Sequence, residues 1–550
     1  MPRLCFKFIC IFIQTLALSL LPRFALGQST QKLTLDQIID LKIANLSLEQ
    51  KVGQLFVIGF PQTKIDRDLM QFLHTYKPGS FILFKRNIKS IEQIKELNTH
   101  LYSLSYRYSE LPPLIAVDQE GGAVSRLPIY PPLPTATALG KTESSELAHR
   151  MGLETGRFLR EVGFNINLAP VLDITPHSES FIGLRSLGGN PKLVAEMGTS
   201  YSKGLQESRV LPTAKHFPGT GSVSEDPHDK IVVSPTNLQQ FQEKHLVPFK
   251  EFSSLEKSKA IMLSHLLYPS LDKENPGTFS KKIINILRSD LGFNDLIITD
   301  DLQMQSSKSL AGKDNPAVKA LIAGADLVMM SWSLKEQQKA FMDVQKAVLD
   351  KRIPEKELHA KLHRILKAKA FTNLYRRPTD LPNLAFDGHL QSPSYQKLEE
   401  DILFENLRPY LIPKSLPQKK SVNARRPASE KIVCLVSASA AFNESFQAGY
   451  SYPQTLKIFS NLEDPKVSIG ACSVSVVVVN NRRQSLWLKS LDRDLRKNIL
   501  VVNQTHPSFV SGAGYYKKIN LYFEHQESGK KIAQHLSDLL RDLNIHLAKN

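Results

Sequence analysis

Eight short apolar runs, separated by amphipathic segments, fill the part of this chain between residues 54 and 331. Each run has the length and composition of a buried strand, and the segments between them have helical periodicity, as in 144–163 and 334–350. Strands that alternate with helices favour a parallel sheet, and eight such units predict a closed (β/α)8 barrel, the TIM-barrel class of α/β fold. The predicted strands are 54–60, 80–85, 114–119, 166–174, 210–217, 260–268, 296–302 and 325–331.

Polar side chains follow several of these runs at the point where the apolar pattern stops. They are Asp118, Lys215 with His216, His265 and Asp300. In a barrel of this class the active site lies at the carboxyl ends of the strands, because all eight strands end on the same face. We therefore expect these side chains to meet in one site.

A second domain is expected after the barrel. Residues 372–394 are rich in Pro, Asn and Asp and lack periodicity, which indicates a linker. Strand-like runs then alternate with helical segments, which predicts a smaller three-layer α/β sandwich domain over 395–550 with a mainly parallel sheet. No glycine-rich phosphate loop follows its first strand, so we interpret it as an accessory domain. Its predicted strands are 431–438, 474–480, 498–504 and 519–525.

The first 27 residues have the pattern of a signal peptide. Arg3 and Lys7 precede an apolar run over 8–21, and small residues follow at 25–27. The run is short for a membrane span, so a cleaved signal is favoured over an uncleaved anchor. We expect export to a periplasm or to the outside of the cell, with a barrel domain that covers 28–371.

The chain of 550 residues carries a formal net charge of +17. It has no basic and aromatic pattern typical of nucleic-acid binding. Two interpretations of the charge remain open: a solvated basic surface, or attraction to an anionic cell envelope. No Cys/His cluster has metal-ligand spacing, so no metal or cofactor is expected, and no obligate protein partner is evident.

The segment 215–230, KHFPGTGSVSEDPHDK, carries the densest chemistry in the chain. Gly219 and Gly221 allow the backbone angles that a tight loop needs. Asp226 and His228 are two residues apart on that loop. A carboxylate beside an imidazole holds the ring in one tautomer and tunes its proton affinity, which is typical of a general acid or base.

This segment resembles glycoside hydrolase family 3, in particular its bacterial β-N-acetylglucosaminidase (NagZ-like) branch in a two-domain, exported form. That branch has a KHFPGHG loop followed by Asp-Ser-His. The chain departs from it at Thr220, where the branch usually has His, and at Pro227, where it usually has Ser. The shared residues are Lys215, His216, Phe217, Pro218, Gly219, Gly221, Asp226 and His228.

Three other segments carry the same resemblance. They are ITDDLQM (298–304), similar to (S/T)-D-D-L-x-M; VDQEGGAVSRL (117–127); and IGLRSLGGNP (182–191). Together with the loop, they imply a glycosidase site within roughly residues 35–370. Over the remainder of the chain the likeness is architectural.

The resemblance implies a role for each site residue. Asp300 is the expected nucleophile and Asp301 a structural carboxylate, because adjacent residues at a strand end point in different directions. His228, oriented by Asp226, is the expected acid/base. Substrate binding is assigned to Asp118, Arg126, Arg185, Lys215 and His216. His265 and Asp173 are expected to support the site, and Glu120 to be structural.

The expected activity is retaining exo-β-N-acetylglucosaminidase action on a small saccharide or muropeptide, derived from peptidoglycan or similar to chitin. Three alternatives stay open. One is a β-N-acetylglucosaminide phosphorylase, since a histidine acid/base does not repel an incoming anion. Another is a β-glucosidase, which the Asp-x-His pair disfavours. The third is a catalytically degenerate protein that binds carbohydrate or cell wall.

Overall fold

The computed structural model describes residues 33–128, 133–175, 180, 182–220, 223, 231–372, 392–411, 432–436, 447, 455–459, 474–479, 499–503 and 517–520. The expected signal peptide, most of the expected linker, and both Asp226 and His228 lie outside these residues. Within them, no helix combines the length and apolarity that a membrane crossing requires.

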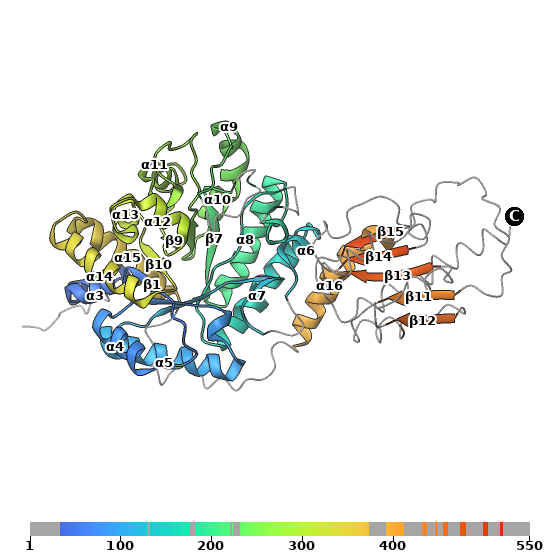
Figure 1. Cartoon of the computed structure of the whole chain (residues 1–550), viewed down its shortest axis with the longest axis horizontal. Helices are drawn as coiled ribbons and strands as arrows, with labels where there is room; N and C mark the ends of the chain where they lie inside the picture. Colours follow the sequence, from blue (N-terminus) through green and yellow to red (C-terminus); the bar gives the residue numbers. More distant parts are fainter. Residues whose placement is uncertain are drawn as a thin grey trace, which may run out of the picture.

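Eight parallel strands close into a barrel, as the apolar runs predict (Figure 1). Their order around the barrel is β1-β10-β9-β8-β7-β6-β3-β2. The run 166–174 forms a shorter strand than expected, since only Ile166–Asn167 is regular and pairing resumes as a single bridge from Val171 to Lys215. Pro170 has no N–H to donate to a ladder at this point. The strands are β1 Phe56–Ile58, β2 Ser80–Leu83, β3 Leu114–Val117, β6 Ile166–Asn167, β7 Leu211–Phe217, β8 Ala260–Leu263, β9 Leu296–Asp301 and β10 Leu327–Met330.

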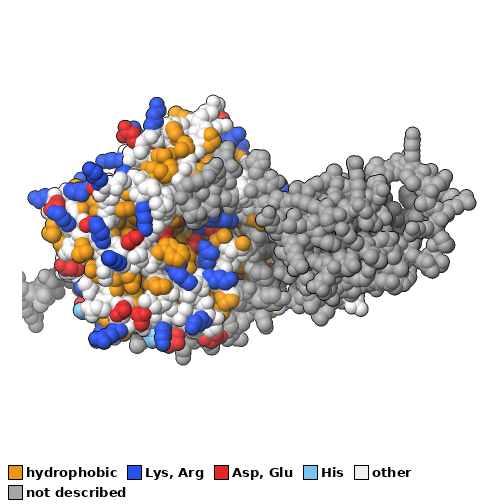
Figure 2. Space-filling view, in the orientation of Figure 1, with side chains coloured by type: hydrophobic (Ala, Val, Ile, Leu, Met, Phe, Trp, Pro, Cys, Tyr) orange, Lys and Arg blue, Asp and Glu red, His pale blue; other side chains and the backbone are white. Residues whose placement is uncertain are grey.

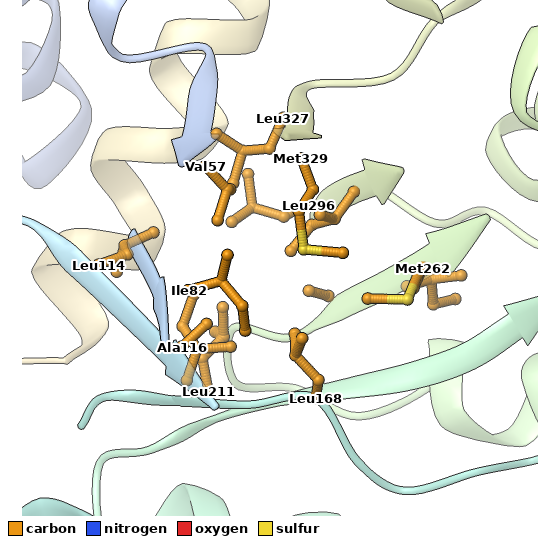
Figure 3. Close-up of a cluster of buried hydrophobic side chains, with 14 of the residues drawn as sticks. Val57, Ile82, Leu114, Ala116, Leu168, Leu211, Met262, Leu296, Leu327 and Met329 are labelled. Atoms are coloured by element: carbon orange, nitrogen blue, oxygen red, sulfur yellow. The ribbon is translucent and has the colours of Figure 1, made fainter. Parts of the chain in front are cut away.

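Apolar side chains fill the inside of the barrel (Figure 3). Alternate residues of one strand point inward, for example Leu114 and Ala116 on β3, and Leu327 and Met329 on β10, because the side chains of a strand alternate between its two faces. All four are at most 4% exposed. The barrel is therefore a packed core, and the chemistry is confined to the loops at its rim.

Helices surround the barrel, and several begin where the sequence supplies a cap. Ser144 accepts a hydrogen bond from the first turn of α7, and Asn190 precedes a proline at the first position of α8. The predictions over 144–163 and 334–350 are confirmed by α7 and α14. The helices of this part are α2 Leu35–Ala44, α3 Leu48–Gly53, α4 Arg67–Tyr76, η1 Lys85–Asn87, α5 Ile91–Ser109, α6 Ala136–Gly140, α7 Ser145–Glu161, η2 Gly183–Arg185, α8 Pro191–Glu207, α9 Leu238–Gln240, η3 Phe241–His245, α10 Leu246–Ser253, η4 Gly277–Phe279, α11 Lys281–Asn285, η5 Ile286–Asp290, α12 Gln305–Ala311, α13 Pro316–Ala323, α14 Leu334–Leu349 and α15 Glu355–Phe371.

Helix α16 (Pro393–Leu411) follows the expected linker and contacts the barrel helices. Its Asp401 forms an ion pair with Arg150 of α7 at 2.8 Å, and its Asn406 donates a hydrogen bond to the Ala138 carbonyl. The surface of the barrel shown in Figure 2 carries scattered Lys and Arg side chains with Asp and Glu among them.

Farther along the chain, five parallel strands form a second sheet in the order β12-β11-β13-β14-β15. Four of them overlap predicted strands. The fifth, β12, was not predicted, because its sequence TLKIF interrupts the apolar run with a lysine. The helices expected to flank this sheet lie outside the described residues. The strands are β11 Ile432–Val436, β12 Thr455–Phe459, β13 Val474–Val479, β14 Ile499–Asn503 and β15 Lys517–Asn520.

Candidate active site

Polar side chains from four different strand ends meet at one mouth of the barrel. Asp118 follows β3, Lys215 and His216 lie near the end of β7, His265 follows β8, and Asp300 is the fifth residue of β9. Because the strands are parallel, their carboxyl ends share one face. The strand-end rule thus correctly predicts that these side chains gather at one face of the barrel.

Lys215 lies at the centre of an ion-pair network. Its Nζ is 2.8 Å from Asp118 Oδ1 and 2.7 Å from Glu120 Oε1. Arg185 donates two hydrogen bonds to the same Glu120, one from Nε to Oε2 at 2.8 Å and one from Nη2 to Oε1 at 2.9 Å. Arg126 completes the network with a 3.4 Å contact to Asp118 Oδ2. The four expected sugar-binding residues of this network are thus brought together.

These partners keep the Glu120 and Lys215 groups charged. Burial by itself would raise the pKa of Glu120, but Arg185 and Lys215 outweigh it and hold that pKa far below its usual range. Burial would lower the pKa of Lys215, and Asp118 with Glu120 reverses this and raises it. The ammonium group therefore remains a hydrogen-bond donor at neutral pH, and charged donors form strong hydrogen bonds to neutral oxygens.

Glu120 is a supporting residue by its geometry. Its carboxylate is nearly buried and both oxygens are engaged by cations. It lies in the small hairpin that β4 (Gln119–Gly121) and β5 (Val124–Ser125) form after β3. This agrees with the structural role expected for it.

A fully buried carboxylate, Asp173, holds the last of the expected sugar-binding residues. Its Oδ2 lies 2.7 Å from Nδ1 of His216, and its Oδ1 accepts a hydrogen bond of 2.8 Å from the backbone N–H of Thr220. The turn is closed by the Gly219 N–H, which donates to the His216 carbonyl at 2.7 Å. Asp173 thereby links the imidazole of His216 to the start of the loop after β7.

Asp300 and Asp301 differ in environment although they are adjacent. Burial would raise the pKa of Asp300, but His265, His216, the Asp301 N–H and Lys215 together lower it. Asp301 is 6% exposed and its pKa is raised, chiefly by burial. Its carboxylate accepts hydrogen bonds from the Ser331 hydroxyl and from the backbone N–H of Gln303.

His265 is buried beside these two aspartates. Its Nδ1 is 2.7 Å from the Thr278 hydroxyl, and its Nε2 donates to the Asp301 carbonyl at 3.0 Å. Burial lowers its pKa. His265 is thus a buried ring held by two hydrogen bonds, as a residue that supports the site would be.

Two features of the rim were not predicted. Arg86 lies between two aromatic rings, 4.4 Å from the centre of Phe84 and 4.2 Å from that of Trp332, and Trp332 is 61% exposed. Arg86 follows the predicted strand 80–85, so the strand-end rule could have identified it. His245, beside Gly219, comes from η3, and no local pattern marks it.

The described residues contain no cluster of three or more His, Cys, Asp or Glu side chains that could hold a metal ion. Asp226 and His228 lie outside the described residues, and their positions relative to Asp300 remain predictions.

Comparisons with known proteins show the family to which the barrel is similar. The family profile described as "Glycosyl hydrolase family 3 N terminal domain" matches residues 47–368. A protein of Nitrosomonas eutropha named "Beta-hexosaminidase" is 34% identical over 283 residues, which cover 50% of this chain and 79% of that protein. A similarly named protein of Idiomarina loihiensis is 33% identical, with 50% of this chain and 82% of that protein covered.

Among solved structures, a family 3 β-N-acetylglucosaminidase of Paenibacillus is similar over most of its length. It is 26% identical, with a TM-score of 0.74, and the match covers 90% of this chain and 97% of that one. The family profile spans more than half of the chain and contains every described residue of the site. This chain belongs to glycoside hydrolase family 3 and is a glycoside hydrolase.

Proposed function

We propose that this protein is a retaining exo-β-N-acetylglucosaminidase that removes terminal β-linked N-acetylglucosamine from peptidoglycan-derived or chitin-like saccharides. The observation that carries the proposal is the lowered pKa of the Asp300 carboxyl group. It lies at a strand end beside two imidazoles and the Lys215 ammonium, which together lower its pKa. An ionised carboxylate at this position is what a double-displacement glycosidase needs as a nucleophile.

In the first step Asp300 attacks the anomeric carbon, so that a bond from that carbon to the carboxylate oxygen forms while its bond to the leaving oxygen breaks. His228, oriented by Asp226, gives its proton to that oxygen. In the second step water attacks the same carbon, the bond to Asp300 breaks, and His228 takes the proton of the water. Two inversions at one carbon retain its configuration.

In this proposal, the hydroxyl groups of the terminal sugar are bound by Lys215, Arg126, Arg185, Asp118 and His216. Lys215, Arg126, Arg185 and Asp118 belong to one ion-pair network that includes Glu120, and Asp173 holds His216. This supports the proposal, because paired charges hold donors and acceptors in fixed positions before substrate arrives. The names of the relatives support the choice of an N-acetylhexosamine.

We further propose that the protein works after export, in a periplasm or outside the cell. The support is the signal-like pattern of residues 1–27. An anionic envelope would attract a chain whose formal net charge is +17.

A chromogenic N-acetylglucosaminide and the matching glucoside, given to purified residues 28–550, test the activity. We expect turnover of the first substrate and little of the second, with release of the β-anomer seen by proton NMR. The D300N variant is the control. Faster turnover of the glucoside, an α-anomer as first product, or a sugar phosphate formed only with added phosphate would each contradict the proposal.

A further inference from the structure

A tryptophan that the proposed mechanism does not use stands exposed at the mouth of the barrel that carries the site. Trp332 is the second residue after β10 and is 61% exposed. Because all barrel strands are parallel, it lies at the same end of the barrel as Asp300. Single exposed apolar side chains are common on proteins and have no meaning by themselves. Trp332 differs from them because both its backbone and its ring are held in place.

The backbone at Trp332 is tied to the end of β9. The amide N–H of Trp332 donates to Gln303 Oε1 at 2.6 Å, and the N–H of Gln303 in turn donates to the Asp301 carboxylate. The hydroxyl and the N–H of Ser331 donate to the same carboxylate. The loop that carries the indole is therefore fixed to the residue that follows Asp300.

The indole ring is held by a guanidinium group that covers one of its faces. The guanidinium carbon of Arg86 lies 4.2 Å from the centre of the Trp332 ring. Arg86 is itself fixed, because its Nε donates to the Phe60 carbonyl at 3.3 Å and its Nη2 to the Ser331 carbonyl at 2.5 Å. A cation over an aromatic ring is attracted to it. The ring therefore keeps one orientation, with its other face open to solvent.

Phe84 connects this pair to the residues expected to bind the terminal sugar. Its ring centre lies 4.4 Å from the guanidinium carbon of Arg86 and 5.9 Å from that of Arg126, which belongs to the ion-pair network of the site. Burial lowers the pKa of Arg86, and the charges of Asp301 and Arg126 also act on this group. Cations and rings thus alternate along the rim from the sugar-binding network to Trp332.

An open aromatic face at this place is suited to a second sugar ring. The C–H groups on one face of a pyranose ring pack against an aromatic ring through dispersion and apolar burial. An exo-acting glycosidase holds the terminal sugar in the mouth, so the rest of the saccharide crosses the rim. We infer that Trp332, backed by Arg86, stacks the sugar ring bonded to the terminal sugar, and that the preferred leaving group is a saccharide. This inference rests on the proposed function of the site.

Two substrates that differ only in the leaving group test the inference. N,N′-Diacetylchitobiose has a sugar as leaving group, whereas methyl β-N-acetylglucosaminide has methanol. W332A should lower kcat/KM about tenfold more on the disaccharide than on the methyl glycoside. The loss should come mainly from KM, because stacking binds the substrate before and during the reaction alike. W332F keeps an aromatic face and should retain most of the preference. Equal losses of W332A on the two substrates, or no loss on either, would overturn the inference.

Two further variants separate the subsite from a general effect of surface aromatic rings. Tyr106 is 38% exposed on helix α5, so Y106A is the matched control and should leave the preference for the disaccharide unchanged. R86K keeps the charge but lacks the flat group that covers the indole, so it should lower the preference in the same direction as W332A. A full preference in R86K would overturn the part assigned to Arg86.

A binding measurement distinguishes this inference from the proposed function. The chain has two tryptophans, Trp332 and Trp487, so W487F leaves Trp332 as the source of indole fluorescence. In the D300N/W487F protein, diacetylchitobiose and cellobiose should be compared with N-acetylglucosamine and glucose. We expect a disaccharide to shift the indole emission and its single sugar to leave it close to that of the free protein. A shift with cellobiose alone would contradict only the proposed function, and emission that neither disaccharide changes would overturn the inference.

Discussion

Asp300 and Asp301 are neighbours at the end of β9, yet the pKa values of their carboxyl groups are shifted in opposite directions. The Asp300 carboxyl is near the imidazoles and the ammonium of the site, which favour its charged form. The Asp301 carboxyl is buried, and Ser331 and Gln303 hold it. One residue is therefore suited to attack a sugar and the other to join β9 to the loop after β10.

The first prediction separates these two carboxyl groups. D300N should lose nearly all turnover, because the carboxylate is needed for chemistry, and it should still fold. D301N should lower the melting temperature, because its amide NH2 cannot accept the hydrogen bonds that the carboxylate accepts. A slow fluorinated substrate, followed by peptide mass spectrometry, should leave its sugar on Asp300. A sugar found on Asp301 would reverse the assignment.

The second prediction concerns His228 and Asp226. General acid catalysis contributes about 10²–10⁴-fold. H228A should therefore slow substrates with poor leaving groups far more than activated aryl substrates, and D226A should give a smaller loss of the same pattern. The measurement is kcat/KM over a series of aryl leaving groups. Equal losses on every leaving group would mean that the segment binds substrate and transfers no proton.

The third prediction concerns the buried pair of Glu120 and Arg185. E120Q removes one charge of a buried ion pair, which typically costs about 3–5 kcal/mol of unfolding free energy. The pKa of Glu120 is lowered in the folded state, so its contribution is complete above its ordinary value of 4.5 and is lost as pH falls below it.

Unfolding in denaturant between pH 3 and pH 7 measures this contribution. The wild type should lose more stability on acidification than E120Q does. Glu207 forms a pair with His149 in which its side chain is 49% exposed, so E207Q is the matched control and should change stability little. Parallel stability curves for the wild type and E120Q would contradict the prediction.

The fourth prediction concerns Lys369, which is fully buried. Its Nζ donates to Gln54 Oε1 and to the Gly79 carbonyl, and burial lowers its pKa from 10.5 to about 7. Between these two values the unfolded chain binds more protons than the folded one, so the unfolding free energy should rise with pH. The full shift corresponds to roughly 5 kcal/mol.

K369M should remove this rise, and K367M, at an exposed position of the same helix, should retain it. Denaturant unfolding from pH 7 to pH 10 provides the measurement. A K369M variant with the same dependence on pH as the wild type would show that Lys369 is charged in the folded protein throughout this range.

The barrel and the gathering of polar side chains at one of its ends could be predicted from local patterns alone. Buried strands and amphipathic helices leave periodic traces in sequence, and parallel strands bring the residues that follow them to one face. Asp118, Lys215 and Asp300 were identifiable for this reason. Strand β12 was missed because Lys457 breaks the apolar pattern on which such predictions depend.

The partners of these residues depended on tertiary structure. Lys215 and Asp118 are 97 positions apart, and nothing in either segment indicates that one ammonium group bridges Asp118 and Glu120. His245 lies beside Gly219 although it comes from another element, and its burial exists only in the folded chain. Periodicity reports which face of an element is buried, whereas contact between side chains depends on how distant elements pack, and this packing has no local signal in the sequence.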